Sequence, residues 1–250
     1  MSMLEKLVNA EQKHRRSDAI PHRVSCRAYA APLSSGDWAA LSYAAGRYVM
    51  PGARLQLLRV EESLFTGTLL STGRVTGCRT VAAVIASSAV TRSKIHAGIL
   101  GEAFCLEATA MGLGTCWMTG TYKKKALTAA LQPGEAVLAI IAVGYPVPGV
   151  IQPAERRRKP VERLCRSDPR TWSEELRRVA RAVQMAPSAM NMQPWAMDQQ
   201  GARFLLDASD RAQLETGIAL CHAELTLHTP HTWRFGSAWR EPAAWCEVGA

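Results

Sequence analysis

The chain has 250 residues, of which 48% are hydrophobic and 20% are charged, and its formal net charge is +9. This composition excludes global disorder, and the length suits either one large domain or two fused small ones. The positive charge would suit a partner with phosphate groups. However, it is divided between ERRRK at 155–159, LRRVAR at 176–181 and KKK at 123–125, and no nucleic-acid-binding motif accompanies it. We therefore expect a globular protein that does not bind nucleic acid.

The sequence gives no sign of a secretory signal or a membrane span. Charges are scattered through the N-terminal stretch MSMLEKLVNAEQKHRR, and the longest apolar run, Ala136 to Val143, is far too short to cross a bilayer. The seven cysteines include no CxxC pair and are odd in number, which favours reduced, buried thiols over a disulfide framework. These features predict a cytoplasmic protein with no membrane partner.

Hydrophobic periodicity over the first 150 residues predicts helices and strands in one body. Two continuous apolar runs, at 80–88 and 136–144, have the composition of strands covered on both faces, so we expect a central sheet. A shorter strand is expected at 54–60. Helices are expected at 37–48, 101–114 and 126–131.

A second unit is expected after the proline- and glycine-rich stretch YPVPGVIQP at 145–153, which is typical of an extended linker. Asp168 and Pro169 have the residue types of a helix cap and a first helical turn. An apolar stripe follows at Trp172, Leu176, Val179 and Val183. We therefore divide the chain into halves at 1–150 and 151–250, packed as one compact unit.

A faint internal repeat supports this division. GARLQLL at 52–58 is similar to GARFLL at 201–206. FCLEA, with Trp117 ten residues after its glutamate, is similar to CHAEL, with Trp233 nine residues after its glutamate. The pattern suggests two copies of a helix-and-strand unit that bury their faces against each other.

Three stretches carry the candidate chemistry: RVSCRAY at 23–29, GLGTCWMTG at 112–120 and APSAMNMQPW at 186–195. In the third stretch, Pro187 must end the preceding helix, and the polar side chains that follow can bond to the local backbone or to a ligand. On composition alone, a polar loop between two elements explains this third stretch at least as well as a binding site.

Taken together in this order, and with the arginines at 156–158, the three stretches resemble the nitroreductase-like FMN flavoproteins. More closely, the chain resembles the single-chain branch in which two half-copies are fused into a pseudo-dimer. The resemblance covers about residues 20–235, and APSAMNMQPW is its most specific motif. It implies an α+β fold in which helices cover a mixed central sheet.

The resemblance also implies an FMN site built from both halves. The phosphate, which needs charge-assisted donors, would be held by Arg23, Ser25, Arg156 and Arg158. Arg27 would lie beside the pyrimidine edge of the flavin and favour its anionic reduced form. The remaining contacts would come from Thr119 and Gly120 near flavin N5 and, from the opposite half, from Pro187, Ser188, Ala189 and Asn191.

The implied function is that of an FMN-dependent oxidoreductase. A hydride would pass from NAD(P)H to flavin N5, and a quinone, nitroaromatic or similar small-molecule acceptor would then take the electrons. Because the cofactor does this chemistry, we nominate no catalytic side chain. The alternative is a non-catalytic flavin-binding or sensor protein of the same fold. Two fused halves are compatible with a monomer.

Two further groups of residues are candidates for a metal site or a catalytic site. His222, His228 and His231 have no carboxylate at supporting spacing, so we expect no metal site. Glu107 and Glu224 lie in apolar helical stretches, where paired structural carboxylates between the halves are favoured over catalytic groups.

Overall fold

The computed structural model describes residues 10–47, 49–67, 74–149, 157–236 and 243–248. Within these ranges the α-helices are α1 (Ala10–Ala19), α2 (Ser35–Arg47), α3 (Ser93–Ala110), α4 (Glu174–Met185) and α5 (Gln213–Thr226). The strands are β1 (Val49–Met50), β2 (Ala53–Arg59), β3 (Thr80–Ser87), β4 (Gly114–Met118), β5 (Glu135–Gly144), β6 (Trp195–Gln200), β7 (Arg203–Ala208), β8 (Trp233–Phe235) and β9 (Ala244–Glu247). The chain therefore has the predicted α+β fold.

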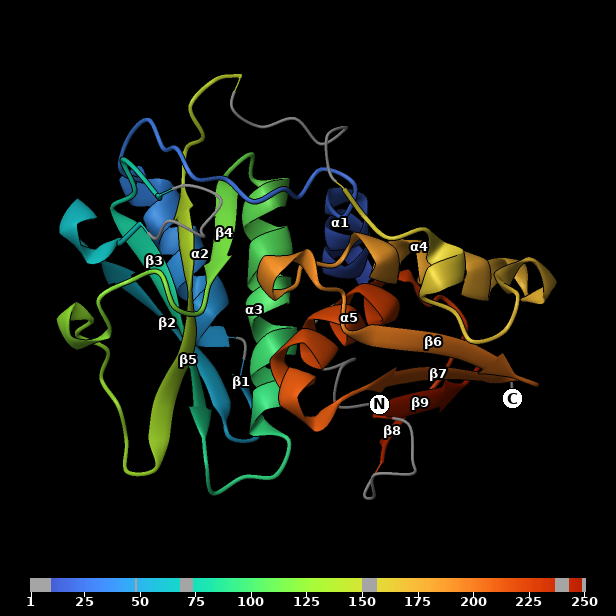
Figure 1. Cartoon of the computed structure of the whole chain (residues 1–250). Helices are drawn as coiled ribbons and strands as arrows, with labels where there is room; N and C mark the ends of the chain where they lie inside the picture. The colour runs from blue at the N-terminus through green and yellow to red at the C-terminus, as the bar shows by residue number, and fades with distance from the viewer. Residues whose placement is uncertain (1–9, 48, 68–73, 150–156, 237–242, 249–250) are drawn as a thin grey trace.

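The strands form two sheets, and α3 and α5 run between them (Figure 1). The first sheet has the order β1-β2-β3-β5-β4, and the second has the order β6-β7-β9-β8. All pairs of neighbouring strands in these sheets are antiparallel. In the described residues, parallel pairing occurs only in isolated bridges, such as that between Ser25 and Thr115.

Both faces of the first sheet are covered, as its apolar strands predicted. On β3, Ala82 and Val84 belong to the main core, which also contains residues of α2 and α3. Val81 belongs to a second cluster on the opposite face, together with Tyr29 and Phe65 from irregular segments. Alternate side chains of one strand thus face two different cores, as the pleat of a strand requires.

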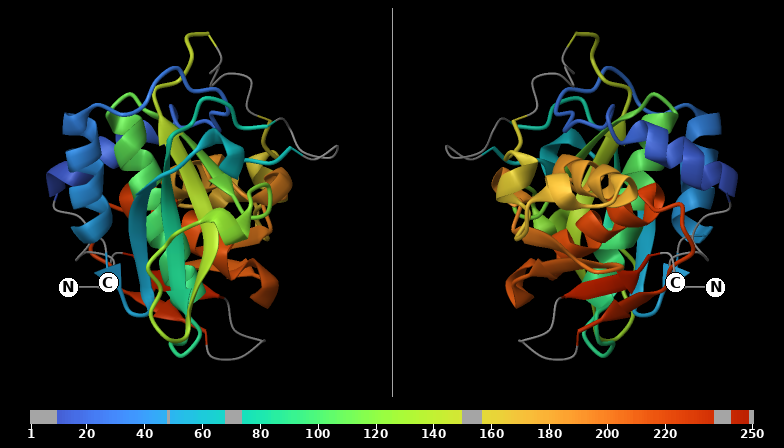
Figure 2. Two further views of the ribbon diagram at one scale, coloured as in Figure 1. Left: turned by 90° about the vertical axis from the view of Figure 1, so that its left-hand side faces the viewer. Right: turned by 90° about the vertical axis from the view of Figure 1, so that its right-hand side faces the viewer.

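Helices α3 and α5 are in backbone contact where they cross. A Cβ atom on Gly98 would lie 2.1 Å from the carbonyl oxygen of Leu214, and one on Gly217 would lie 2.0 Å from that of Ile95. Only glycine permits such an approach, because any side chain would overlap the neighbouring backbone. Figure 2 shows the molecule from the side of the first sheet and, in the opposite view, from the side of α4 and the second sheet.

The apolar stripe of the second half forms as predicted, but its cap is different. Trp172, Leu176, Val179 and Val183 are all buried. Helix α4 begins at Glu174, and the Ser173 side chain accepts a hydrogen bond from the Leu176 backbone N–H. Asp168 instead caps a short 3-10 helix at Pro169–Thr171. The apolar pattern predicted the buried face of α4, but Asp168 and Ser173 are both suitable cap residues, so the sequence left the first residue of the helix ambiguous.

The helix predicted at 101–114 is longer at its start and shorter at its end. Helix α3 begins at Ser93 and ends at Ala110. Gly112, with φ of 79°, has the left-handed conformation that commonly terminates helices. Gly114 is already the first residue of β4, a strand that the sequence pattern did not predict.

The helix predicted at 126–131 is wrong, because only Lys124–Ala126 forms a short 3-10 turn there. Polar side chains of β2 hold the following backbone in an irregular conformation. Gln56 accepts a hydrogen bond from the Ala130 N–H, and the Arg54 guanidinium donates to the Ala130 carbonyl. These tertiary contacts use backbone groups that a helix would need for itself.

The second sheet repeats the strand order of the first without a counterpart of its central strand. If β3 is left out, β1-β2-β5-β4 corresponds to β6-β7-β9-β8 in chain order and in position. The predicted boundary of the halves at residue 150 lies outside the described residues, so the division itself stays a prediction. Among the helices described, none is both long enough and apolar enough to cross a membrane.

Candidate functional site

The first sequence motif lies along the edge of the second. Ser25 forms a parallel bridge with Thr115 of β4, and the Cys26 N–H donates to the Thr115 carbonyl at 2.8 Å. The buried Tyr29 fixes the motif from the other side, because its hydroxyl donates to the carbonyls of Cys26 at 2.8 Å and Ala142 at 3.2 Å. The structure therefore brings residues 23–29 and 112–120 together.

The third motif is joined to the basic tract. The Arg158 Nη1 donates to the Asn191 Oδ1 at 2.8 Å, and the Asn191 Nδ2 donates to the Arg157 carbonyl at 2.9 Å. The Gln193 Oε1 accepts from the Lys159 N–H at 2.7 Å. These side-chain contacts clamp the loop after α4 onto residues 157–159.

The same loop has an unusual backbone. Met190, Asn191 and Gln193 have φ angles of 49°, 55° and 45°, in the left-handed region that non-glycine residues seldom occupy. Ser188 helps to hold this conformation, since its hydroxyl accepts from the Gln193 N–H at 2.8 Å. Each such residue costs on the order of 1–3 kcal/mol, and conformations of this kind cluster at binding sites.

Arg158 and Arg23 lie close enough for their charges to interact, although they are far apart in the sequence. Burial, and then the charge of Arg23, lowers the pKa of the Arg158 guanidinium to about 10, while Glu102 opposes the shift. Arg23 is 1% exposed, and its Nε lies 3.5 Å from the Glu102 Oε1. The Arg158 Nε is buried and has no hydrogen-bond partner within the described ranges. One buried and one half-buried cation therefore lie near one buried carboxylate, an excess of positive charge that suits an anion.

The other predicted residues of the first 150 positions differ in their exposure. Ser25, Thr119 and Gly120 are exposed, and Arg27 is half-buried. Burial raises the pKa of the Cys116 thiol, while the charge of Arg27 opposes the rise, so Arg27 lies near β4. A Cβ atom at Gly120 would have no neighbour within 4 Å, which leaves open space beside the chain there.

The remaining predicted residues belong to the second half. Pro187 is buried, Ser188 is half-buried, and Ala189 and Asn191 are exposed. Arg156 lies outside the described residues. Trp195, which the sequence reading assigned to the core, is 4% exposed in β6.

Glu102 lies at this site, and the sequence analysis did not predict a role for it. Its carboxylate is fully buried and accepts hydrogen bonds from the Trp117 Nε1 at 2.8 Å and the His222 Nε2 at 2.9 Å. A buried glutamate within the apolar run GILGEAF needs polar partners, so the sequence did contain a signal that Glu102 belongs to a polar cluster. His222, which was weighed as a metal ligand, is one of these partners.

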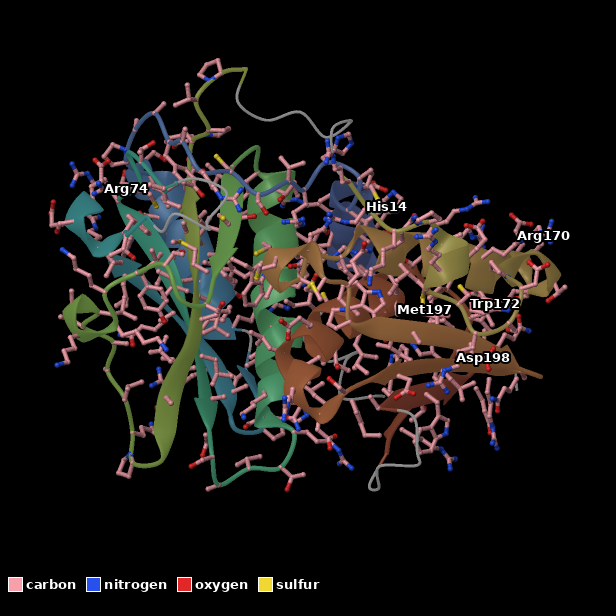
Figure 3. All side chains as sticks on the ribbon, in the orientation of Figure 1. His14, Arg74, Arg170, Trp172, Met197 and Asp198 are labelled. Carbon is pink, nitrogen blue, oxygen red and sulfur yellow. The ribbon has the colours of Figure 1, made fainter. Side chains whose placement is uncertain are left out.

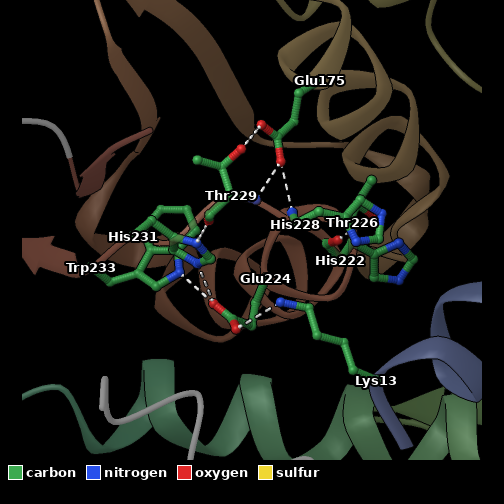
Figure 4. Close-up of polar contacts among 9 residues, drawn as sticks. All are labelled: Lys13, Glu175, His222, Glu224, Thr226, His228, Thr229, His231 and Trp233. Atoms are coloured by element: carbon green, nitrogen blue, oxygen red, sulfur yellow. Dashed lines mark hydrogen bonds and ion pairs between the residues drawn. The ribbon is translucent and has the colours of Figure 1, made fainter. Parts of the chain in front are cut away.

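The two glutamates expected to be structural are both paired. Glu107 accepts from the Arg16 Nε at 2.9 Å. Glu224 accepts from the His231 Nε2 and the Trp233 Nε1, each at 2.8 Å, and lies 3.4 Å from the Lys13 Nζ (Figure 4). These contacts support the structural interpretation of both carboxylates.

The Glu224–His231 pair shifts both of its pKa values. Burial has the largest single effect on Glu224 and would raise its pKa, but the hydrogen bonds from His231 and Trp233 and the charges of His231 and Lys13 together outweigh it and lower the pKa. Burial also has the largest single effect on His231 and would lower its pKa, but the hydrogen bonds to Glu224 and the Thr229 carbonyl and the charge of Glu224 together outweigh it and raise the pKa. His228 lies nearby and bonds through its backbone N–H to Glu175, whose side chain holds this loop (Figure 4). Each of the three histidines is thus hydrogen-bonded to a glutamate, His222 and His231 through the ring and His228 through its backbone N–H.

Positive charge outside the site is spread over the molecule. Arg74 and Arg170 lie at opposite ends, and His14 lies on α1 between them (Figure 3). Arg170 is paired with Asp168 at 2.8 Å, and Arg166 is paired with Asp207. This distribution agrees with the division of the basic tracts along the sequence.

Comparison with known proteins identifies the family. A family model described as "Putative TM nitroreductase" matches residues 17–227. The chain belongs to this family. No curated protein matches the sequence of this nitroreductase-family member.

One solved structure shows the same fold. This Thermotoga maritima protein, described as a "putative nitroreductase", is 20% identical, with 93% of each chain covered and a TM-score of 0.67. Two partial similarities are to chains solved with FMN. One, from Desulfovibrio desulfuricans, is 21% identical and covers 62% of this chain and 96% of that one, with a TM-score of 0.47. The other, from Bacteroides fragilis, is 14% identical and covers 61% and 95%, with a TM-score of 0.44. The family model confirms the predicted family, and the Thermotoga maritima structure confirms the predicted fold.

Proposed function

We propose that this nitroreductase-family protein binds FMN between its two halves and acts as an NAD(P)H-dependent oxidoreductase on a small-molecule acceptor. The observation that carries the proposal is the proximity of the buried Arg23 and the half-buried Arg158, whose charges interact and whose Arg158 Nε–H has no acceptor among the described residues. We assign the FMN phosphate to this point. Family membership and the APSAMNMQPW loop support the same cofactor.

The residues present fit a phosphate group. Asn191 and the Met185 carbonyl accept from the two terminal nitrogens of Arg158, at 2.8 and 3.3 Å, so the guanidinium is held in place, while no described residue accepts from its buried Nε–H. An unsatisfied buried N–H costs on the order of 1–3 kcal/mol, and a phosphate oxygen would remove that cost. Arg23 would supply a second charged donor.

The protein's own contribution is binding, orientation and electrostatics. When bound, FMN would supply a flavin ring that accepts hydride at N5 and passes electrons on. Arg23 and Arg158 would fix its phosphate, and the resemblance assigns Arg27 to the pyrimidine edge. The clamped loop at 187–191 would cover the ring from the second half and keep water away from it.

The first test is the visible spectrum of the purified protein. A yellow chromophore that is released as FMN and bleached by NADH or NADPH is the expected result. A yellow protein inert to both nucleotides would support the alternative of a non-catalytic flavin-binding or sensor protein. A protein that binds no flavin, even after incubation with FMN, would refute the proposal.

The second test removes one of the two arginines, Arg23 and Arg158, that form the proposed phosphate cradle. Arg158→Ala and Arg23→Ala should each weaken FMN binding at least tenfold, because a charge-assisted hydrogen bond is worth about 1.5–3 kcal/mol and about 1.4 kcal/mol corresponds to a factor of ten. Arg157→Ala is the matched control, since Arg157 is exposed and meets Asn191 only through its backbone carbonyl. Fluorescence titration of the apo-protein measures all three. Equal affinity in the two cradle variants and the control would remove the arginines from the site.

A further inference from the structure

Two buried carboxylates in the described part of the chain have the same set of partners. Glu102 on α3 contacts the indole of Trp117, the imidazole of His222 and the guanidinium of Arg23. Glu224 on α5 contacts the same chemical groups in Trp233 and His231, and its cation is Lys13 (Figure 4). Only the first set contains a residue of the proposed phosphate cradle, so the second set is a natural control.

Hydrogen bonding fixes how many protons the Glu102–His222 pair holds. The His222 Nδ1 lies 2.8 Å from the Ala182 carbonyl, which can only accept, so Nδ1 carries a proton. The His222 Nε2 lies 2.9 Å from the Glu102 Oε1, and a bond at this distance requires one more proton between the two atoms. Wherever that proton resides, the pair as a whole is neutral.

This shared proton sets the charge that faces an anion. When it is present, Glu102 is balanced by His222, and Arg23 and Arg158 together present two positive charges. When it is absent, Glu102 is an uncompensated carboxylate 3.5 Å from the Arg23 Nε and cancels one of them. A phosphate monoester carries about −1.5 to −2 charges at neutral pH, which matches the first state.

Other ionisable groups around the pair do not change this count. Burial raises the pKa of the Cys105 thiol on α3 and of the Cys221 thiol on α5 well above the usual value, so both stay neutral. Arg16 on α1 is engaged by Glu107 at 2.9 Å. Among the described residues, the charges of Arg23 and Glu102 both act on the Arg158 guanidinium.

We propose that Glu102 and His222 form a positioning pair that, through Arg23, makes the site selective for a phosphorylated flavin over riboflavin. His222 holds the proton that keeps Glu102 from neutralising Arg23, and Glu102 orients the Arg23 guanidinium. The inference rests on the proposed function, because it describes how the same cradle recognises its cofactor.

The test compares FMN with riboflavin on the full-length apo-protein by fluorescence titration. The measured quantity is the ratio of the riboflavin dissociation constant to that of FMN, which isolates the phosphate contribution. His222→Gln should lower this ratio about tenfold or more, because one net positive charge is lost. The double variant Glu102→Gln/His222→Gln should restore it, because no carboxylate is left to cancel Arg23. The matched variant His231→Gln should leave the ratio unchanged.

A merely structural role gives a different pattern. His222→Gln would then weaken FMN and riboflavin equally, and the double variant would be no better than the single one, which would overturn the inference. If His222→Gln does not fold, His222→Asn takes its place with the same expected fall in the ratio, and an unchanged ratio would overturn the inference. Wild-type protein that binds neither flavin would refute the proposed function as well, whereas a wild-type preference for FMN that survives His222→Gln refutes this inference alone.

Discussion

The helix crossing at Gly98 and Gly217 gives a stability prediction that can be worked from the structure. In Gly217→Ala, the new methyl group would lie 2.0 Å from the Ile95 carbonyl oxygen and 2.9 Å from the Gly98 Cα. Both are backbone atoms, so no side chain can rotate away and the helices must separate. Overpacking of this kind costs about 1–3 kcal/mol, and here we expect the upper end, offset by up to about 1 kcal/mol because alanine favours a helix over glycine.

The expected net loss is therefore about 2 kcal/mol of unfolding free energy. For a chain of this size, it lowers the melting temperature by about 4–8 °C. Gly46→Ala is the matched control, because Gly46 also lies in a helix and a Cβ there would meet nothing within 4 Å. That variant should gain about 0.5–1 kcal/mol. Circular dichroism during urea and thermal unfolding measures both variants, and equal shifts in the two would refute the packing argument.

Three further predictions concern the flavin and the buried charges. Arg27→Gln should lower the midpoint potential of bound flavin while FMN still binds, because a nearby cation favours the anionic reduced form; spectroelectrochemical titration checks this, and an unchanged or raised potential contradicts it. The Glu224–His231 pair should make stability fall on both sides of a plateau. The part due to the lowered pKa of Glu224 is lost as pH falls through that pKa, and the part due to the raised pKa of His231 is lost as pH rises through that pKa. Glu224→Gln should flatten this profile in urea unfolding, and an unaltered profile would exclude the pair as its cause. Finally, each chain should hold one FMN within itself, so residues 1–150 alone should fail to bind it; two flavins per chain, or full affinity in that fragment, would refute a single shared site.

The elements that could be predicted from the sequence are those whose own side chains determine them. The strand at 80–88 and the buried stripe of α4 follow from hydrophobic pattern alone, and both form as expected. The expected helix at 126–131 failed because Arg54 and Gln56, on a distant strand, bind the backbone of Ala130. Such tertiary hydrogen bonds override local propensity and leave no local signal.

The candidate site could be predicted in its parts but not in its assembly. The motifs point to Arg23, Arg158 and the loop at Asn191, and the structure brings these residues together. No sequence spacing relates Glu102 to His222, because they meet only through the crossing of α3 and α5. The polar partners of a buried charge are a property of the packed helices.

Since Arg23 and Arg158 belong to one polypeptide, their meeting does not depend on how concentrated the protein is. A site shared by two separate subunits comes apart on dilution, and its cofactor is then lost with the assembly. Within a single chain the second arginine is supplied at an effective concentration set by the connecting segment, typically of millimolar order. The cradle would therefore stay assembled at any expression level, and cofactor retention would respond to the free FMN concentration alone.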